Sequence, residues 1–307
     1  MSHSHGESSA SPNQLKRYDN KLGVVHLPKF LFLRDAVDSV QDTLNFSWAV
    51  KDRGWEQFND STKPGRVALL SSILSLLLGL HTPFLFSAHP TIVQWSWYMV
   101  SLSTFHLLEF FVTAVFHPLR TDPPVGGNAF LVNHSRTYTI AFFIAVAEFW
   151  MRKFVSAAFY QVSFHSWRIS WFLGICLVVG GQFVRSLAMA TAGSNFHHIV
   201  QVQRPDEHQL VTHGIYKYLR HPSYTGWFYW SIGTQLILCN PLSTILYGFV
   251  AHKFFAHRIP YEERALLRMY GKEYIEYVAR SGIYIPGIGG VDVPLTDVGV
   301  VVSKKNG

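Results

Sequence analysis

Four stretches of about 20 mostly apolar residues limit what this chain can fold into more than any other feature. About 20 such residues are needed for one helix to cross a bilayer. The stretches are residues 66–87, 91–116, 130–150 and 167–192. Only 15% of the residues are charged, against about 25% in an average soluble domain, and 49% are hydrophobic. We therefore expect an all-α integral membrane protein.

Two shorter apolar limbs, residues 222–239 and 241–256, follow the fourth stretch and meet at Asn240 and Pro241. An Asn-Pro pair favours a break in the helix, so the limbs should fold back on each other as a helical hairpin. At 1.5 Å per residue each limb spans only about 25 Å, which predicts marginal or tilted crossings. The total is then about six transmembrane helices.

The loops predict the orientation and the domain boundaries. Residues 1–65 are polar and rich in Lys and Arg, which places them in the cytosol by the positive-inside rule. Residues 66–192 hold the first four spans, and 193–284 form a catalytic region whose loops and C-terminal part return to the cytosol. Residues 285–307 are expected to be an irregular tail. The loop near Arg152 and Arg168 would then face the lumen, which the positive-inside rule disfavours.

We interpret the net charge of +7 as a sign of contact between the protein and anionic lipid. The sequence has no basic run with interleaved aromatic residues that would predict nucleic-acid binding. Glu109 and Glu148 lie near span ends and are expected to be structural. Arg185 lies deeper, and should pair with Glu109 or face a polar cavity. Cys176 and Cys239 lie in apolar segments and predict neither a disulfide nor a metal site.

Two polar clusters carry the candidate chemistry. The first is the segment 195–224, which is dense in His, Tyr and Gln. Its histidines lack the spacing of metal ligands on a regular element, so a pocket for a polar cofactor is the better interpretation. Tyrosine rings can sit beside an adenine or a sulfonium cation.

The second cluster is Arg258 with Glu262. A guanidinium is a planar, permanently charged fork that suits a carboxylate, and Glu262 lies one helical turn further on the same face. Taken alone, such a pair is more typical of an ordinary surface ion pair. If the hairpin delivers it to the polar loop, a functional role is favoured.

At these residues the chain resembles the isoprenylcysteine carboxyl methyltransferases. The resemblance runs from about residue 133 to residue 284. It is densest in AGSNFHH (192–198), HQLVTHGIYKYLRHPSYTGWFYWSIGTQLILCNP (208–241) and FFAHRIPYEE (254–263). The RHPxYxG motif is shared with other membrane methyltransferases and loosely with sterol reductases. The residues that continue this motif, GWFYWSIGTQ and CNP, at their spacing from Arg258 and Glu262, are more specific for the family.

The resemblance implies transfer of a methyl group from S-adenosylmethionine to the C-terminal carboxylate of a prenylated cysteine in CaaX proteins. It implies a multi-pass protein of the endoplasmic reticulum membrane with catalytic loops facing the cytosol. Arg258 would meet the substrate carboxylate. The implied cofactor residues are Gln201, His208, Gln209, Leu210, Val211, Tyr216, His221, Pro222, Ser223, Tyr224 and Glu262.

Three alternatives stay open from the sequence. A methyltransferase for phospholipid amines should carry an acid or a His base where Arg258 lies. An NADPH-dependent sterol reductase should be longer and have an Arg-rich phosphate site. A non-enzymatic membrane scaffold would leave the His, Tyr, Arg and Glu residues without a purpose.

Overall fold

The structure is a computed structural model, and it describes residues 58, 60, 63–116, 127–132, 136–159, 164–198, 200–201 and 209–291. Nearly all of the predicted N-terminal extension therefore lies outside the described residues. The α-helices are α4 (Pro64–His81), α5 (Pro90–Phe116), α6 (Arg136–Phe159), α7 (Phe164–Ala192), α8 (Pro222–Leu238), α9 (Pro241–Tyr270) and α10 (Lys272–Arg280). Short 3-10 turns are η2 (Thr82–Phe84), η3 (Gly127–Phe130), η4 (Gly193–Asn195) and η5 (Gly214–Lys217).

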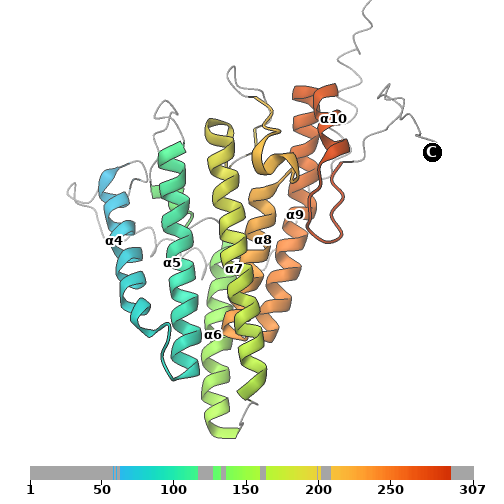
Figure 1. Ribbon diagram of the computed structural model, residues 1–307. Helices are drawn as coiled ribbons and strands as arrows, with labels where there is room; N and C mark the ends of the chain where they lie inside the picture. The colour runs from blue at the N-terminus through green and yellow to red at the C-terminus, as the bar shows by residue number, and fades with distance from the viewer. Residues whose placement is uncertain are drawn as a thin grey trace, which may run out of the picture.

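The axes of helices α4 to α9 are roughly aligned, and α10 lies at one end beside the last turns of α9 (Figure 1). The connection from α7 to α8 lies at that same end. Among the described residues, the regular secondary structure is helical, apart from one β-bridge between Leu219 and Gly282. The predicted all-helical fold is confirmed for these residues.

Within the described residues, three helical segments are long and apolar enough to cross a membrane: Pro64–Phe84, Pro90–Phe116 and Trp167–Asn195. Each of the six predicted segments overlaps a helix, but α8 has only 17 residues and both α6 and α9 carry several charged residues. Membrane crossing by these three helices, and hence the count of six, stays a prediction.

Helix α9 is longer than the predicted limb, because it continues without a break from Pro241 through Pro260 to Tyr270. An internal proline removes one backbone hydrogen bond but does not end this helix. The chain instead turns at Gly271, whose φ of 50° suits glycine, and α10 begins there. One continuous helix thus carries both an apolar limb and the Arg258–Glu262 cluster.

The reversal between α8 and α9 confirms the predicted hairpin. Cys239 ends α8 in the left-handed conformation, with φ of 56°. The side-chain amide of Asn240 donates to the carbonyl of Ala145 on α6 at 2.9 Å. Glu148, also on α6, accepts from the first free backbone N–H groups of α9, at 3.0 Å from Leu242 and 2.7 Å from Ser243. The predicted structural role of Glu148 is therefore that of a helix cap supplied by another helix.

Helices α7 and α8 approach each other closely through pairs of glycines. A Cβ atom added to Gly181 would lie 2.5 Å from the carbonyl oxygen of Gly226, and one added to Gly174 would lie 2.8 Å from that of Gly233. Small residues at such spacing let two backbones pack in direct contact, which is common between membrane helices. This contact places the N-terminus of α8 beside the C-terminal half of α7.

A buried ion pair joins α5 to α7. Arg185 donates from Nε to Oε1 of Glu109 and from Nη2 to Oε2 at 2.8 Å, and the two side chains are 7% and 0% exposed. Removing one partner of a buried pair leaves an uncompensated charge, which is strongly destabilising. The first of the two expectations for Arg185, pairing with Glu109, is correct.

The glycine contact gives a prediction with a matched control. Gly181→Ala should lower the unfolding temperature in detergent, because the new methyl group forces the α8 backbone away, at a cost of about 1–3 kcal/mol. Gly180→Ala should not lower it, because a Cβ atom there meets nothing within 4 Å and alanine favours the helix. Equal unfolding temperatures for the two variants would contradict the close-packing explanation.

Candidate active site

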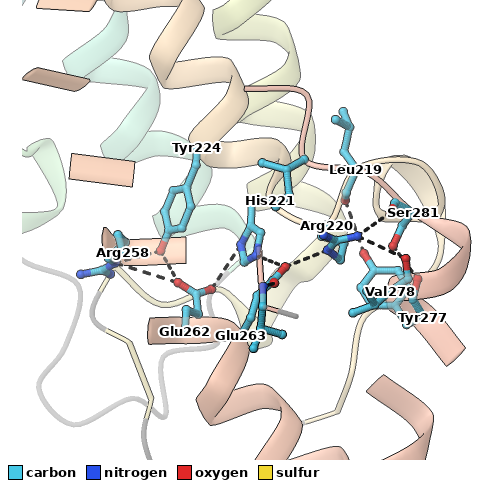
Figure 2. A network of polar contacts seen from close by, with 12 residues as sticks. Leu219, Arg220, His221, Tyr224, Arg258, Glu262, Glu263, Tyr277, Val278 and Ser281 are labelled. Atoms are coloured by element: carbon cyan, nitrogen blue, oxygen red, sulfur yellow. Dashed lines mark hydrogen bonds and ion pairs between the residues drawn. The ribbon is translucent and has the colours of Figure 1, made fainter. Parts of the chain in front are cut away.

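The hairpin brings the two polar clusters of the sequence together. The hydroxyl of Tyr224, in the first turn of α8, donates to Oε2 of Glu262 on α9 at 2.5 Å. Nε of Arg258 donates to the same hydroxyl at 3.1 Å, and lies 3.9 Å from Oε2 of Glu262. Arg258 and Glu262 are therefore more than an isolated surface pair, because Tyr224 links them across the hairpin (Figure 2).

Arg258 also reaches the connection that follows α7. Its Nη2 donates to the backbone carbonyl of His198 at 2.7 Å. The side chains of Arg258 and Glu262 are each 24% exposed. The guanidinium is thus oriented by two hydrogen bonds from different parts of the chain while remaining open to a ligand.

A pocket with about 830 Å³ of empty space, including its open mouth, lies beside this cluster. The pocket is lined by Ala192, Asn195, Phe196, His197, Val200, Gln201, Gln209, Leu210, Val211, Tyr216, Arg220, His221, Pro222, Ser223, Tyr224, Glu262, Leu266, Met269 and Tyr277. Its walls come from the connection between α7 and α8, from the start of α8 and from α9 and α10.

The predicted cofactor residues that fall within the described chain all line this pocket. They are Gln201, Gln209, Leu210, Val211, Tyr216, His221, Pro222, Ser223, Tyr224 and Glu262. His208 lies outside the described residues. Arg258 is not part of the lining itself but is hydrogen-bonded to Tyr224, which is. The assigned roles of all these residues stay predictions, whereas their convergence is a geometric fact.

Glu263 is the residue that sequence reasoning missed. Its side chain is fully buried, and Oε1 accepts from Nε of Arg220 at 2.7 Å and lies 3.2 Å from Nε2 of His221. Oε2 accepts from the backbone N–H of Val291 at 2.6 Å. The only signal in the sequence was its position next to Glu262. A buried glutamate requires a cationic partner, and that partner, Arg220, is distant along the chain.

The surroundings of Glu263 keep it ionised. Burial alone would raise its pKa, but the hydrogen bond with His221, the backbone N–H of Val291 and the charge of Arg220 together hold the pKa below the usual 4.5 of a glutamate. Glu263 is therefore a permanent negative charge behind the wall of the pocket.

Arg220 fastens the C-terminal segment, residues 281–291, to the start of α8. Its guanidinium donates to the carbonyls of Val278 at 3.2 Å, Gly289 at 3.3 Å, and Ser281. Its backbone N–H donates to Gly282 at 2.8 Å within the β-bridge. Residues 285–291 belong to the predicted irregular tail; they form no helix or strand, yet they pack against the site.

The Glu109–Arg185 ion pair between α5 and α7 also touches the pocket. Nη1 of Arg185 donates to the hydroxyl of Ser223 at 2.9 Å, and Ser223 is part of the lining. The Glu109–Arg185 pair thereby connects α5 and α7 to the first turn of α8. Its position is set by the close packing of α7 on α8.

Among the described residues, no group of three or more His, Cys, Asp or Glu side chains is arranged to hold a metal ion. The absence of a metal from the reaction stays a prediction.

Comparison with known proteins places the chain in a family. Residues 173–268 match the model of the isoprenylcysteine carboxyl methyltransferase (ICMT) family. The chain is 41% identical to the human protein-S-isoprenylcysteine O-methyltransferase over 233 residues, which covers 75% of this chain and 78% of the human one. The Saccharomyces cerevisiae protein of the same name is 39% identical, covering 72% of this chain and 91% of the yeast one.

The chain belongs to the isoprenylcysteine carboxyl methyltransferase family. A solved structure of the eukaryotic intramembrane Ras methyltransferase ICMT is similar, with a TM-score of 0.67 and 33% identity, and the match covers 91% of this chain and 93% of that one. The family match contains α8, most of α9 and the residues of the Arg258–Tyr224–Glu262 cluster. The resemblance read from the sequence motifs is therefore confirmed.

The lowered pKa of Glu263 predicts a pH dependence of stability. Its ion pair stabilises the folded state fully above about pH 4.5, the usual pKa of a glutamate, and this contribution is lost as the pH falls towards 2. Thermal unfolding in detergent should show Glu263→Gln to be less stable than the parent at pH 6, with the difference shrinking towards low pH. A difference that is constant across this range would contradict the assignment.

Proposed function

We propose that this protein is an S-adenosylmethionine-dependent methyltransferase that esterifies the C-terminal carboxylate of a prenylated cysteine in processed CaaX proteins. The observation that carries the proposal is the convergence of the predicted residues on one pocket, with the Arg258–Tyr224–Glu262 cluster at its edge. Relatives that align with about three quarters of the chain bear the name of this activity.

S-adenosylmethionine, when bound, supplies a methyl group on a cationic sulfonium. The pocket offers it an apolar side from Leu210, Val211 and Leu266, which suits an adenine ring. It also offers hydrogen-bond acceptors and anionic charge from Glu262 and His221. This division into an apolar wall and a few convergent polar groups is typical of cofactor sites.

Arg258 is assigned to the carboxylate of the acceptor. Its Nε and Nη2 already donate to Tyr224 and His198, and these bonds fix the plane of the guanidinium. The remaining N–H groups can receive a carboxylate oxygen as a charge-assisted hydrogen bond. An acceptor held there lies next to the pocket that holds the cofactor, which supports in-line transfer between reactants about 3–3.5 Å apart.

The proposed reaction needs no general base, because a carboxylate is already ionised at neutral pH. The residues of the site therefore have to position a weak nucleophile and exclude water from two oppositely charged reactants. Tyr224 and Glu262 serve this by orienting Arg258 and lining the pocket. A catalytic triad is not required.

The prenyl chain explains why the enzyme is built from apolar helices. Each buried CH₂ group contributes about 0.8 kcal/mol to partitioning into lipid, so the substrate concentrates in the bilayer. We place the protein in the endoplasmic reticulum membrane with the pocket facing the cytosol, where S-adenosylmethionine is available. The connection from α7 to α8, which lines the pocket, lies at the end of the bundle that carries α10, and this supports access from an aqueous side (Figure 1).

The two enzymatic alternatives fit the site less well. A phospholipid amine must lose a proton before it attacks, and the fixed cation of Arg258 would repel the protonated amine. A sterol reductase requires phosphate contacts for NADPH, and the cationic side chain that the pocket presents, Arg220, is already paired with Glu263.

The acceptor can be tested directly. Purified protein with labelled S-adenosylmethionine should form a base-labile methyl ester on N-acetyl-S-farnesylcysteine, because the prenyl group brings the carboxylate to the site. N-acetylcysteine without the prenyl group and a phospholipid amine serve as comparison acceptors. Equal rates with the unprenylated acceptor would rule out the proposed substrate class.

A lysine in place of Arg258 separates orientation of the carboxylate from simple charge. Arg258→Lys keeps the charge but loses the fork, so turnover should fall by about 30- to 1000-fold, corresponding to about 2–4 kcal/mol. Binding of S-adenosylmethionine, measured by calorimetry, should change little. The control is Arg264→Lys, at an exposed position of the same helix. Turnover of Arg258→Lys close to that of the control would refute the role of Arg258.

A further inference from the structure

His221 lies between two carboxylates that have different surroundings. Its Nε2 is 3.2 Å from Oε1 of the buried Glu263, and its Nδ1 is 3.7 Å from Oε1 of the partly exposed Glu262. The ring is nearly parallel to that of Tyr224, with an interplanar angle of 3° and centroids 5.5 Å apart, so its orientation is set (Figure 2). The two nitrogens therefore face different environments, one behind the pocket and one at it.

The distances distinguish the protonation states of the ring. A neutral imidazole carries one N–H and one acceptor nitrogen. If Nε2 were the acceptor, its lone pair would face a carboxylate oxygen at 3.2 Å in a place that water does not reach. A ring protonated on both nitrogens would also donate towards Glu262, yet 3.7 Å is too long for that hydrogen bond. The geometry favours a proton on Nε2 alone.

We propose that Glu263 is a positioning residue that fixes His221 in its Nε2-protonated form, so that Nδ1 and the carboxylate of Glu262 together accept hydrogen bonds from the cofactor. Both His221 and Glu262 line the pocket, whereas Glu263 lies behind it. Two adjacent acceptors, one of them anionic, select a hydroxyl pair or an ammonium group. The inference rests on the proposed function for the identity of the cofactor but concerns a residue to which that proposal gives no role.

The recognised group is either the ribose diol or the ammonium of S-adenosylmethionine. The product S-adenosylhomocysteine carries both groups, whereas 5′-methylthioadenosine carries only the ribose. If the acceptors hold the ribose, substitutions here should weaken binding of both ligands. If they hold the ammonium, only S-adenosylhomocysteine should be affected.

The direct test is the ring-nitrogen NMR spectrum of protein labelled with ¹⁵N-histidine. The His221 signals are identified by their loss in His221→Asn. The expected result, without cofactor, is a protonated Nε2 and an unprotonated Nδ1. A proton on Nδ1, alone or in addition, would overturn the proposal. This measurement uses no cofactor, so its failure is distinct from a failure of the proposed function, which would appear as absence of S-adenosylmethionine binding by the parent protein.

A double-mutant cycle tests whether Glu263 acts through His221. Glu263→Gln should weaken S-adenosylhomocysteine binding by about tenfold, the effect of one charge-assisted hydrogen bond, when His221 is present. In the His221→Asn background the same change should have an effect below about twofold. Equal losses in both backgrounds would show that Glu263 acts only by holding the C-terminal segment, and would overturn the proposal.

Thr225→Val is the matched control for that structural effect. Thr225 donates to the carbonyl of Ile283 at 2.6 Å, and its hydroxyl lies 3.1 Å from the backbone carbonyl of His221. The change therefore removes a hydrogen bond that fastens the same segment without removing a contact of the His221 ring. It should lower the unfolding temperature without weakening ligand binding. A loss of affinity equal to that of Glu263→Gln would also count against the proposal. If Glu263→Gln fails to fold, the NMR result decides.

Discussion

The reversal of the chain between α8 and α9 is the constraint on which the site depends. Tyr224 and Glu262 are brought to hydrogen-bonding distance only because two helices joined at Cys239–Pro241 run back along each other. The reversal leaves backbone groups without partners within a largely apolar body. Asn240 and Glu148 provide partners for the exposed backbone groups around the reversal, through contacts with α6. A turn at one end of the bundle thereby determines the chemistry at the other.

Two buried ion pairs hold the site against the rest of the protein. Glu109–Arg185 connects α5 and α7 to Ser223, and Arg220–Glu263 connects the start of α8 to α9 and the C-terminal segment. Buried pairs of this kind contribute little net stability, because desolvation offsets much of their attraction. Their value here is geometric, since a guanidinium with several fixed partners leaves few alternative arrangements of the surrounding backbone.

The site divides its work between groups that face the pocket and groups that hold them. Glu262 and Arg258 are exposed enough to meet ligands, and His221 lines the pocket although it is buried. Glu263 and Arg220 are also buried, and they make most of their contacts with backbone or with each other. A reaction that needs no general base puts greater weight on position than on acidity. This agrees with a site whose buried members orient their neighbours.

The sequence by itself determined the helical class, the hairpin at Asn240–Pro241 and the family, because apolar length, a proline break and a long motif are local properties of the chain. It also identified the pocket-lining residues, through the motif that contains His221 and Tyr224. Only the tertiary structure decided that Arg220 pairs with Glu263, that α9 continues through Pro260, and that Glu263 lies behind His221. Those features depend on the close approach of helices distant in sequence, such as Gly181 on α7 and Gly226 on α8, and no local pattern encodes that approach.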